Sequence, residues 1–207
     1  MSALNASQTD ALTELINIAF GLTASKLSEI SGQRVLLEAP VISIHPVDDL
    51  AQELESFVTG EVAGIHQVFT GPFSGDAILC LNYDGAVRLS NLLVDEHHRS
   101  ERLNSRNGEV LTEVGNMLLS ACLGVFGNLL EVRVSFSIPL LHLESLKSLF
   151  ASITIGGDGL RHAVVIATSF RIRKEDVAGQ LVIVLAASSL ERLIHSVEVW
   201  EKSQFST

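Results

Sequence analysis

Residues 109–130 read EVLTEVGNMLLSACLGVFGNLL, and this stretch contains an acid–amide motif that occurs twice in the chain. Glu113 and Asn116 stand three residues apart, Glu109 lies four residues before Glu113, and Pro139 follows Asn116 after 22 intervening residues. The same spacing recurs 99 residues earlier in Asp10, Glu14, Asn17 and Pro40. A single short motif is common, but its repetition together with a distant proline indicates a duplicated structural unit.

Both copies of the motif lie in stretches whose apolar residues recur at helical spacing. The predicted buried stripes are Leu12, Leu15, Ala19, Leu22 and Ile30 in the first helix, and Leu111, Val114, Leu118, Cys122, Val125 and Leu129 in the second. Residues three or four apart share a helix face, so the motif acids and amides fall on the opposite stripe. Small residues follow them on that stripe, at Gly21 and Ser25 in one copy and at Ser120 and Gly124 in the other. We therefore expect two polar faces that point away from the core and allow close approach.

The rest of each half combines strand patterns with a closing helix. Strands are predicted within 34–45, 57–69, 77–81, 132–143, 149–155, 161–170 and 180–187, a short acidic helix over 48–55, and closing helices from residue 84 and over 188–200. Residues 77–93 align without a gap with 181–197. The prediction is an α/β fold, a layered sandwich with a pseudo-two-fold internal repeat and long helices packed on a shared, largely antiparallel sheet. Residues 1–207 would form a single domain, with repeats over 8–94 and 107–200 and a polar linker over 95–106.

The composition narrows the possible partners and the cellular setting. The chain is 47% hydrophobic and 18% charged, with a net charge of −10, which argues against nucleic acid and anionic membrane surfaces as partners. Its apolar windows are too short to span a membrane, and no secretion signal opens the chain. Cys80 and Cys122 lie in apolar runs and are predicted to be small buried thiols. A cytoplasmic protein without membrane insertion is expected.

A glutamate and an asparagine three residues apart contain no good nucleophile, but they suit another kind of chemistry. The carboxylate can pair with a cation on a partner, and the amide can orient a water molecule. Hydrolysis of a phosphoryl group needs little more, because its catalysis is mainly positioning and electrostatics.

The spacing resembles the signature of the CheC/CheX/FliY phosphatases of bacterial chemotaxis, in which Asp or Ser, Glu, Asn and Pro follow one another at these distances. Asp10, Glu14, Asn17 and Pro40 fit that pattern fully. The second copy departs from it at Glu109, while Ile16 stands where the first copy would often have Gly. Two complete motifs in 207 residues resemble CheC more than the single-motif, dimeric CheX, and no segment remains for the additional flagellar-switch parts of FliY.

The resemblance implies hydrolysis of the aspartyl phosphate on a CheY-type response regulator. Glu14 and Glu113 would pair with a lysine of the regulator, and Asn17 and Asn116 would hold the attacking water. Asp10, Glu109, Gly21, Ser120, Pro40 and Pro139 would support the motif or the docking of the partner. The regulator would supply Mg²⁺, so this chain would need no cofactor or metal ligand of its own. The resemblance further implies a monomer and the deamidase CheD as a candidate partner.

Two alternatives remain open from the sequence. One is a non-catalytic member of the same superfamily, a binding module or a switch-related adaptor whose Glu–Asn faces only dock a response regulator or CheD. The other is an interaction scaffold unrelated to phosphate. The relative strength of the two sites is also open, since Glu109 adds charge near Glu113 and a bulky Ile16 could crowd docking at the first helix.

Overall fold

The computed structural model describes residues 5–32, 34–55, 58, 60–71, 74–94, 96–129, 131–152, 161–172 and 175–204. Its helices are α1 (Ala6–Ser31), α2 (Leu50–Glu55), α3 (Tyr83–Leu93), α4 (Ser105–Leu129), α5 (Leu146–Ser152) and α6 (Ala187–Gln204), with 3₁₀ turns η1 (Val47–Asp49) and η2 (Glu96–His98). Its strands are β1 (Val35–Leu37), β2 (Val41–Pro46), β3 (Glu61–Thr70), β4 (Gly75–Asn82), β5 (Ser135–Phe136), β6 (Leu140–Ser145), β7 (Arg161–Ile172) and β8 (Glu175–Ala186).

The strands form one sheet in the order β1, β7, β8, β4, β3, β5, with β2 also pairing with β7 and β6 with β3. The pairs are antiparallel. The order is the same from either edge, because two short outer strands flank a long strand on each side of the central β4–β8 pair. The predicted α/β class with a largely antiparallel sheet is confirmed. The division into two repeats stays a prediction, which the symmetric strand order supports.

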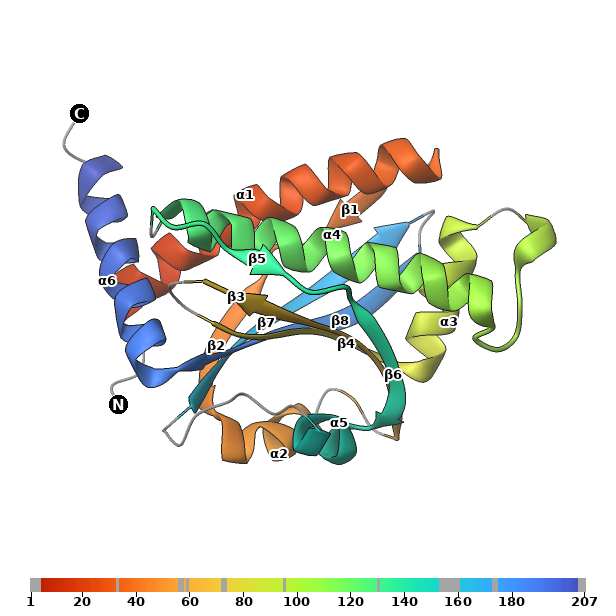
Figure 1. Cartoon of the computed structure of the whole chain (residues 1–207). Helices are drawn as coiled ribbons and strands as arrows, with labels where there is room; N and C mark the ends of the chain where they lie inside the picture. Colours follow the sequence, from red (N-terminus) through yellow and green to blue (C-terminus); the bar gives the residue numbers. More distant parts are fainter. Residues whose placement is uncertain are drawn as a thin grey trace.

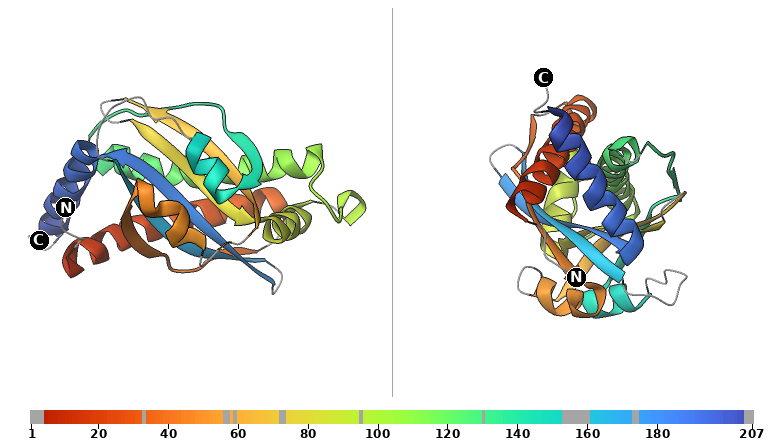
Figure 2. Two further views of the ribbon diagram at one scale, coloured as in Figure 1. Left: turned by 90° about the horizontal axis from the view of Figure 1, so that it is seen from below. Right: turned by 90° about the vertical axis from the view of Figure 1, so that its left-hand side faces the viewer.

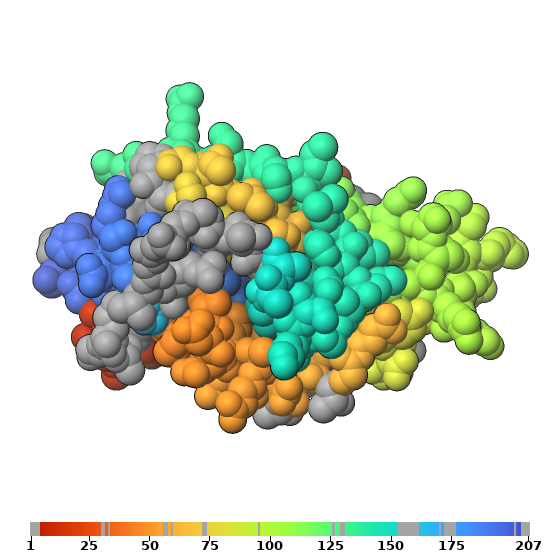
Figure 3. All heavy atoms as spheres, turned by 60° about the horizontal axis from the view of Figure 1, so that its bottom comes forward, coloured from red at the N-terminus to blue at the C-terminus, as the bar shows by residue number. Residues whose placement is uncertain are grey.

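The helices form two layers, one on each face of the sheet (Figure 1). The long helices α1 and α4, together with α3 and α6, cover one face, and α2 and α5 cover the other (Figure 2). Viewed toward the second face, α2 and α5 lie side by side (Figure 3). This arrangement agrees with the predicted layered sandwich, and among the described residues no further layer covers the outer sides of α1 and α4.

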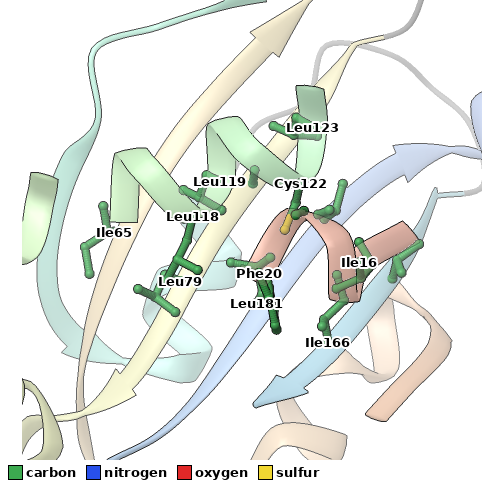
Figure 4. Close-up of a cluster of buried hydrophobic side chains, with 14 of the residues drawn as sticks. Ile16, Phe20, Ile65, Leu79, Leu118, Leu119, Cys122, Leu123, Ile166 and Leu181 are labelled. Atoms are coloured by element: carbon green, nitrogen blue, oxygen red, sulfur yellow. The ribbon is translucent and has the colours of Figure 1, made fainter. Parts of the chain in front are cut away.

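The larger core lies between the sheet and the two long helices (Figure 4). Ile16 and Phe20 from α1 and Leu118 and Cys122 from α4 meet strand residues such as Leu79 there. Each of these side chains is at most 3% exposed. Burying an aliphatic side chain of this size contributes about 1.5–3 kcal/mol, so this layer holds both motif helices firmly on the sheet.

Helix α1 begins with a capping box and ends at a glycine. Asn5 Oδ1 accepts a hydrogen bond from Gln8 N, and Gln8 Oε1 accepts one from Asn5 N, both at 2.8 Å. These bonds satisfy backbone N–H groups that have no partner within the helix. Gly32 adopts φ 63°, the left-handed conformation that glycine allows at a helix end.

The buried side of α1 differs in part from the prediction. Leu12, Leu15 and Ala19 are buried as expected, but Leu22 is 60% exposed. Ile16, expected on the docking face, is fully buried. Among the described side chains of α1, the buried ones are Ala11, Leu12, Leu15, Ile16, Ala19, Phe20, Thr23 and Leu27. The apolar side is therefore wider than the predicted stripe, and Ile16 cannot crowd a partner on the outer face.

In α4 the prediction fits more closely. Leu111, Val114, Leu118 and Cys122 are buried, while Val125 is only partly so. The side chains of Ile30 and Leu129, also predicted to point inward, lie outside the described part of the structure.

The strand predicted over 149–155 is wrong in its described part, because Leu146–Ser152 form α5. Ser145 Oγ accepts a hydrogen bond from Ser148 N at 3.2 Å and so caps the first turn. Leu146 and Leu149, three residues apart, are buried together on the sheet. The β-branched residues that suggested a strand begin only at residue 153, and 153–155 lie outside the described residues. None of the helices in the described part of the chain is long and apolar enough to cross a membrane.

Candidate functional site

The four motif carboxylates lie on the outer sides of α1 and α4, which pack side by side on the same face of the sheet (Figure 1). Asp10 and Glu14 on α1 and Glu109 and Glu113 on α4 are exposed. Because the opposite side of each helix is buried against the sheet, the helix geometry turns these acids toward solvent, as the sequence predicted. Both carboxylate pairs can therefore meet a cationic group on a partner.

The two motif asparagines have different surroundings. Asn116 Oδ1 accepts a hydrogen bond from Gln67 Nε2 at 3.1 Å and a longer one from Ser120 Oγ at 3.4 Å. Gln67 lies on β3 and is 2% exposed, and its Nε2 also donates to Ser137 O at 2.8 Å. Asn17 is likewise partly buried, but among the described residues no side chain is found hydrogen-bonded to it. Within the described part of the chain, a buried side chain of the core therefore holds Asn116 but not Asn17.

The contact with Ser137 also determines how the amide of Asn116 is turned. A main-chain carbonyl accepts only, so Gln67 must present its amino group toward Ser137 O. That same amino group faces Asn116, which must then present Oδ1 to it. The Nδ2 group of Asn116 is consequently directed away from Gln67 and remains able to donate.

Equivalent main-chain contacts identify the residue that occupies the place of Gln67 at the first site, beside α1. Ser137 N donates to Val68 O, and Glu38 N, 99 residues before Ser137, donates to Ser169 O. The residue before Ser169 is Thr168, whose Oγ1 donates to Glu38 O at 3.1 Å, just as Gln67 donates to Ser137 O. A threonine hydroxyl has a single proton, so Thr168 cannot also donate to Asn17.

The motif prolines stand just before the outer strands of the sheet. Pro40 precedes β2 and Pro139 precedes β6. Proline lacks an N–H group and is suited to the first residues of an edge strand. Ser137, two residues before Pro139, is the residue that accepts from Gln67. Gln67 on β3 therefore connects Asn116 to the segment just before Pro139, so the motif asparagine and the motif proline are linked in the structure.

Two grooves run along α4 and make the motif residues accessible. A groove of about 410 Å³ between α1 and α4 is lined in part by Asn116 and Lys26. A groove of about 630 Å³ between the start of α4 and β6 is lined in part by Glu109, Glu113 and Leu141. Water can therefore reach Asn116, and a side chain of a partner can reach Glu113.

The thiols do not provide a nucleophile near these helices. Cys80 and Cys122 are free and buried, as predicted. Burial raises the pKa of Cys80 to about 12 from its ordinary 9.0 and raises the pKa of Cys122 as well. Because the thiolate is the reactive form, both sulfur atoms are inert near neutral pH. Within the described ranges, no three His, Cys, Asp or Glu side chains gather in a way that could hold a metal ion.

Sequence reasoning missed Gln67, and it also missed a polar pair on the opposite face of the sheet. Gln67 could have been noticed as a polar residue at an inward position of a strand that alternates through Ala63, Ile65 and Phe69. On the other face, His66 Nε2 lies 2.7 Å from Asp76 Oδ1, a pairing for which the sequence offers no spacing signal.

Several solved structures are similar to this chain in fold. No protein-family model matches the chain. The structure of FliY from Thermotoga maritima is similar with a TM-score of 0.73 and 16% identity, covering 94% of this chain and 98% of that chain. The FliM middle domain from H. pylori is similar with a TM-score of 0.66 and 13% identity, covering 93% of this chain and 99% of that chain. A chain of the FliG–FliM complex from H. pylori is similar with a TM-score of 0.65 and 12% identity, covering 93% of this chain and 100% of that chain.

These similarities show that the protein has the fold of FliY and of the FliM middle domain. The resemblance inferred from the duplicated motif is thus confirmed for the fold. Length does not distinguish this chain from the solved FliY chain, contrary to the expectation from the sequence, because 98% of that chain is covered. A specific closeness to CheC stays a prediction.

Proposed function

We propose that the protein is a phosphatase that hydrolyses the aspartyl phosphate of a CheY-type response regulator. One observation carries this proposal. Glu113 is exposed, and Asn116 lies about one turn further along α4, where its amide accepts a hydrogen bond from the buried Gln67. An exposed carboxylate beside an oriented amide suits a reaction in which the enzyme positions a partner and a water molecule.

Each group has a defined role in this proposal. Glu113 pairs with a lysine of the regulator and sets the orientation of the complex. Asn116 donates from Nδ2 to a water molecule, which leaves a lone pair of that water free to attack phosphorus. The new bond from water oxygen to phosphorus forms as the bond from phosphorus to the aspartyl oxygen breaks, and the products are inorganic phosphate and the free aspartate. The water proton passes to phosphate or to bulk solvent.

Glu14 and Asn17 would perform the same roles on α1. Mg²⁺ would belong to the regulator and would neutralise charge on the phosphoryl oxygens. The grooves on both sides of α4 give a partner room to place its lysine and its phosphorylated aspartate near Glu113 and Asn116. The proposal includes a cytoplasmic setting, a monomer and a role in chemotaxis, with CheD as a further candidate partner.

The second candidate function is a binding module without catalysis. The similarity to the FliM middle domain favours it, since a FliG–FliM complex is among the similar structures. In this case the two Glu–Asn faces would dock a regulator or another protein, and no hydrolysis would follow. Binding alone therefore cannot separate the two functions.

The decisive experiment follows phosphate loss from a phosphorylated CheY-type regulator in the presence of Mg²⁺. Wild type is compared with Glu14→Ala/Asn17→Ala, with Glu113→Ala/Asn116→Ala and with the quadruple variant, and binding of the phosphorylated regulator is measured in parallel. The phosphatase function predicts faster phosphate loss with wild type than with the quadruple variant. Equal rates with intact binding would leave only the binding module.

A further inference from the structure

Gln67 is a buried side chain that adds a hydrogen bond to Asn116 to a main-chain contact that Thr168 makes alone at the first site. Its Nε2 makes both of the contacts described above, while its Oε1 is buried with no hydrogen-bond partner in the described structure. A buried acceptor without a partner is unfavourable, so an apolar residue of the same size would serve the core at least as well. The amide at this position is best explained by what its amino group does for Asn116.

We propose that Gln67 is a positioning residue that makes the second site the stronger of the two, an inference that rests on the proposed phosphatase function. An asparagine amide rotates readily about its last side-chain bond, and its oxygen and nitrogen can exchange places. The bond from Gln67 removes that freedom and keeps Nδ2 of Asn116 directed to the side where water is held. The amide of Asn116 therefore needs less reorientation when the regulator docks.

The first site lacks both donors that hold Asn116. Thr168 stands at the place of Gln67, and its single proton is given to Glu38 O. Gly21 stands 99 residues before Ser120 and offers no hydroxyl. Asn17 therefore samples several orientations of its amide, of which only some place a donor toward the water molecule. Glu14 and Glu113 are both exposed, so the difference that bears on the position of the water is the support of the asparagine.

The kinetic test uses a background of Glu14→Ala/Asn17→Ala, so that only the second site acts. Gln67→Met keeps the length of the side chain and removes its donors. We expect kcat to fall about tenfold, as the loss of one orienting hydrogen bond implies, while the Kd for the phosphorylated regulator changes less than twofold. Thr168→Val, the matched change at the first site, is expected to leave second-site kcat unchanged. An unchanged kcat in Gln67→Met would overturn the proposal.

A double-mutant cycle separates positioning from a general effect on the fold. Where Asn116→Ala is already present, Gln67→Met is expected to cause no further loss, because the group that it positions is gone. An equal loss with and without Asn116 would contradict the positioning role. The thermal midpoint of Gln67→Met is expected not to fall, which makes misfolding a separate and recognisable outcome.

An independent readout does not need enzymatic activity. The side-chain amide signal of Asn116 in a ¹⁵N spectrum is the one that disappears in Asn116→Asp, and Asn17 is assigned in the same way. Its heteronuclear NOE reports fast motion, and we expect a rigid value for Asn116, a mobile value for Asn17, and a mobile value for Asn116 in Gln67→Met. Equal mobility of the two asparagines in wild type would overturn the positioning role, whereas an inactive wild type would overturn the phosphatase function instead.

Discussion

Gly115 and Ile65 lie so close together that only glycine fits in this part of α4. A Cβ atom built on Gly115 would stand 2.5 Å from Ile65 Cγ2 and 2.7 Å from Ile65 Cβ. Gly115, directly before the motif asparagine, therefore faces the sheet and leaves the docking surface to the neighbouring residues. In the first copy Ile16 occupies this position, fully buried, so α1 accommodates a large side chain where α4 admits none.

Gly115→Ala is expected to destabilise the protein by roughly 1–3 kcal/mol, because the contact is with the branched, buried part of Ile65 and cannot relax easily. Gly124→Ala, in the same helix, is the matched control. A Cβ there has no neighbour within 4 Å, so replacing glycine should stabilise the helix by about 0.5–1 kcal/mol. Urea unfolding of the two variants measures whether the free energy of unfolding falls in Gly115→Ala and rises in Gly124→Ala. An undiminished stability of Gly115→Ala would contradict the close contact.

The motif positions, the long helices and the buried thiols could be predicted from the sequence, because helical periodicity alone separates one face of a helix from the other. The width of the buried side of α1 could not be predicted. Ile16 and Leu22 are both apolar, and which of them is covered depends on how α1 lies against α4 and the sheet. Tertiary packing decided that question.

Gln67 illustrates a second limit. It lies 49 residues from Asn116, and the equivalent place at the first site holds a threonine, so no repeat or motif points to it. The contact exists because β3 runs beneath α4, which only the sheet topology determines. A buried polar residue in an alternating strand is the one signal that the sequence contains, and that signal does not name its partner.

Glu109 is expected to slow the approach of an anionic regulator to the second site. It is exposed and lines the same groove as Glu113. Glu109→Gln removes one negative charge and should raise the association rate severalfold at low salt and by less at physiological salt, since a Debye length of about 8 Å screens the interaction there. Stopped-flow binding at two ionic strengths measures this effect.

The control for Glu109→Gln is Glu191→Gln, which removes an exposed carboxylate from α6 and should leave second-site association nearly unchanged. An equal acceleration by both variants would mean that only the overall charge of −10 matters. No acceleration by either would mean that the groove at Glu109 is not on the approach path.

The buried thiols make the protein sensitive to alkaline pH. The pKa of Cys80 is raised to about 12 in the folded state, against an ordinary value of 9.0 that the unfolded chain regains. The folded state therefore holds its proton more tightly, so this contribution to stability is complete below pH 9 and is lost as the pH rises toward 12. The free energy of unfolding should fall by up to about 1.4 kcal/mol per pH unit and per thiol in that window. Urea unfolding between pH 8 and pH 11 measures the slope, which should become smaller in Cys80→Ala.

Gly21→Ser is expected to strengthen the first site by supplying a donor that Asn17 lacks. Ser120 makes this contact in the second copy, where its Oγ lies 3.4 Å from Asn116 Oδ1. The first copy has room for the same side chain, because a Cβ on Gly21 would have no neighbour within 4 Å. In a Glu113→Ala/Asn116→Ala background, where only the first site acts, kcat should rise about two- to threefold, less than a full hydrogen bond would give because the contact is long.

Gly21→Ala separates the hydroxyl from the helix propensity. Both substitutions replace glycine inside α1 and should stabilise the helix, Ala more than Ser. Only the serine can donate to Asn17, so a higher kcat in both variants would assign the gain to a stiffer helix and not to the amide. A gain confined to Gly21→Ser would show that the orientation of Asn17 limits the first site. That outcome would connect the weakness of the first copy and the strength of the second to one physical cause, the number of donors that hold the motif asparagine.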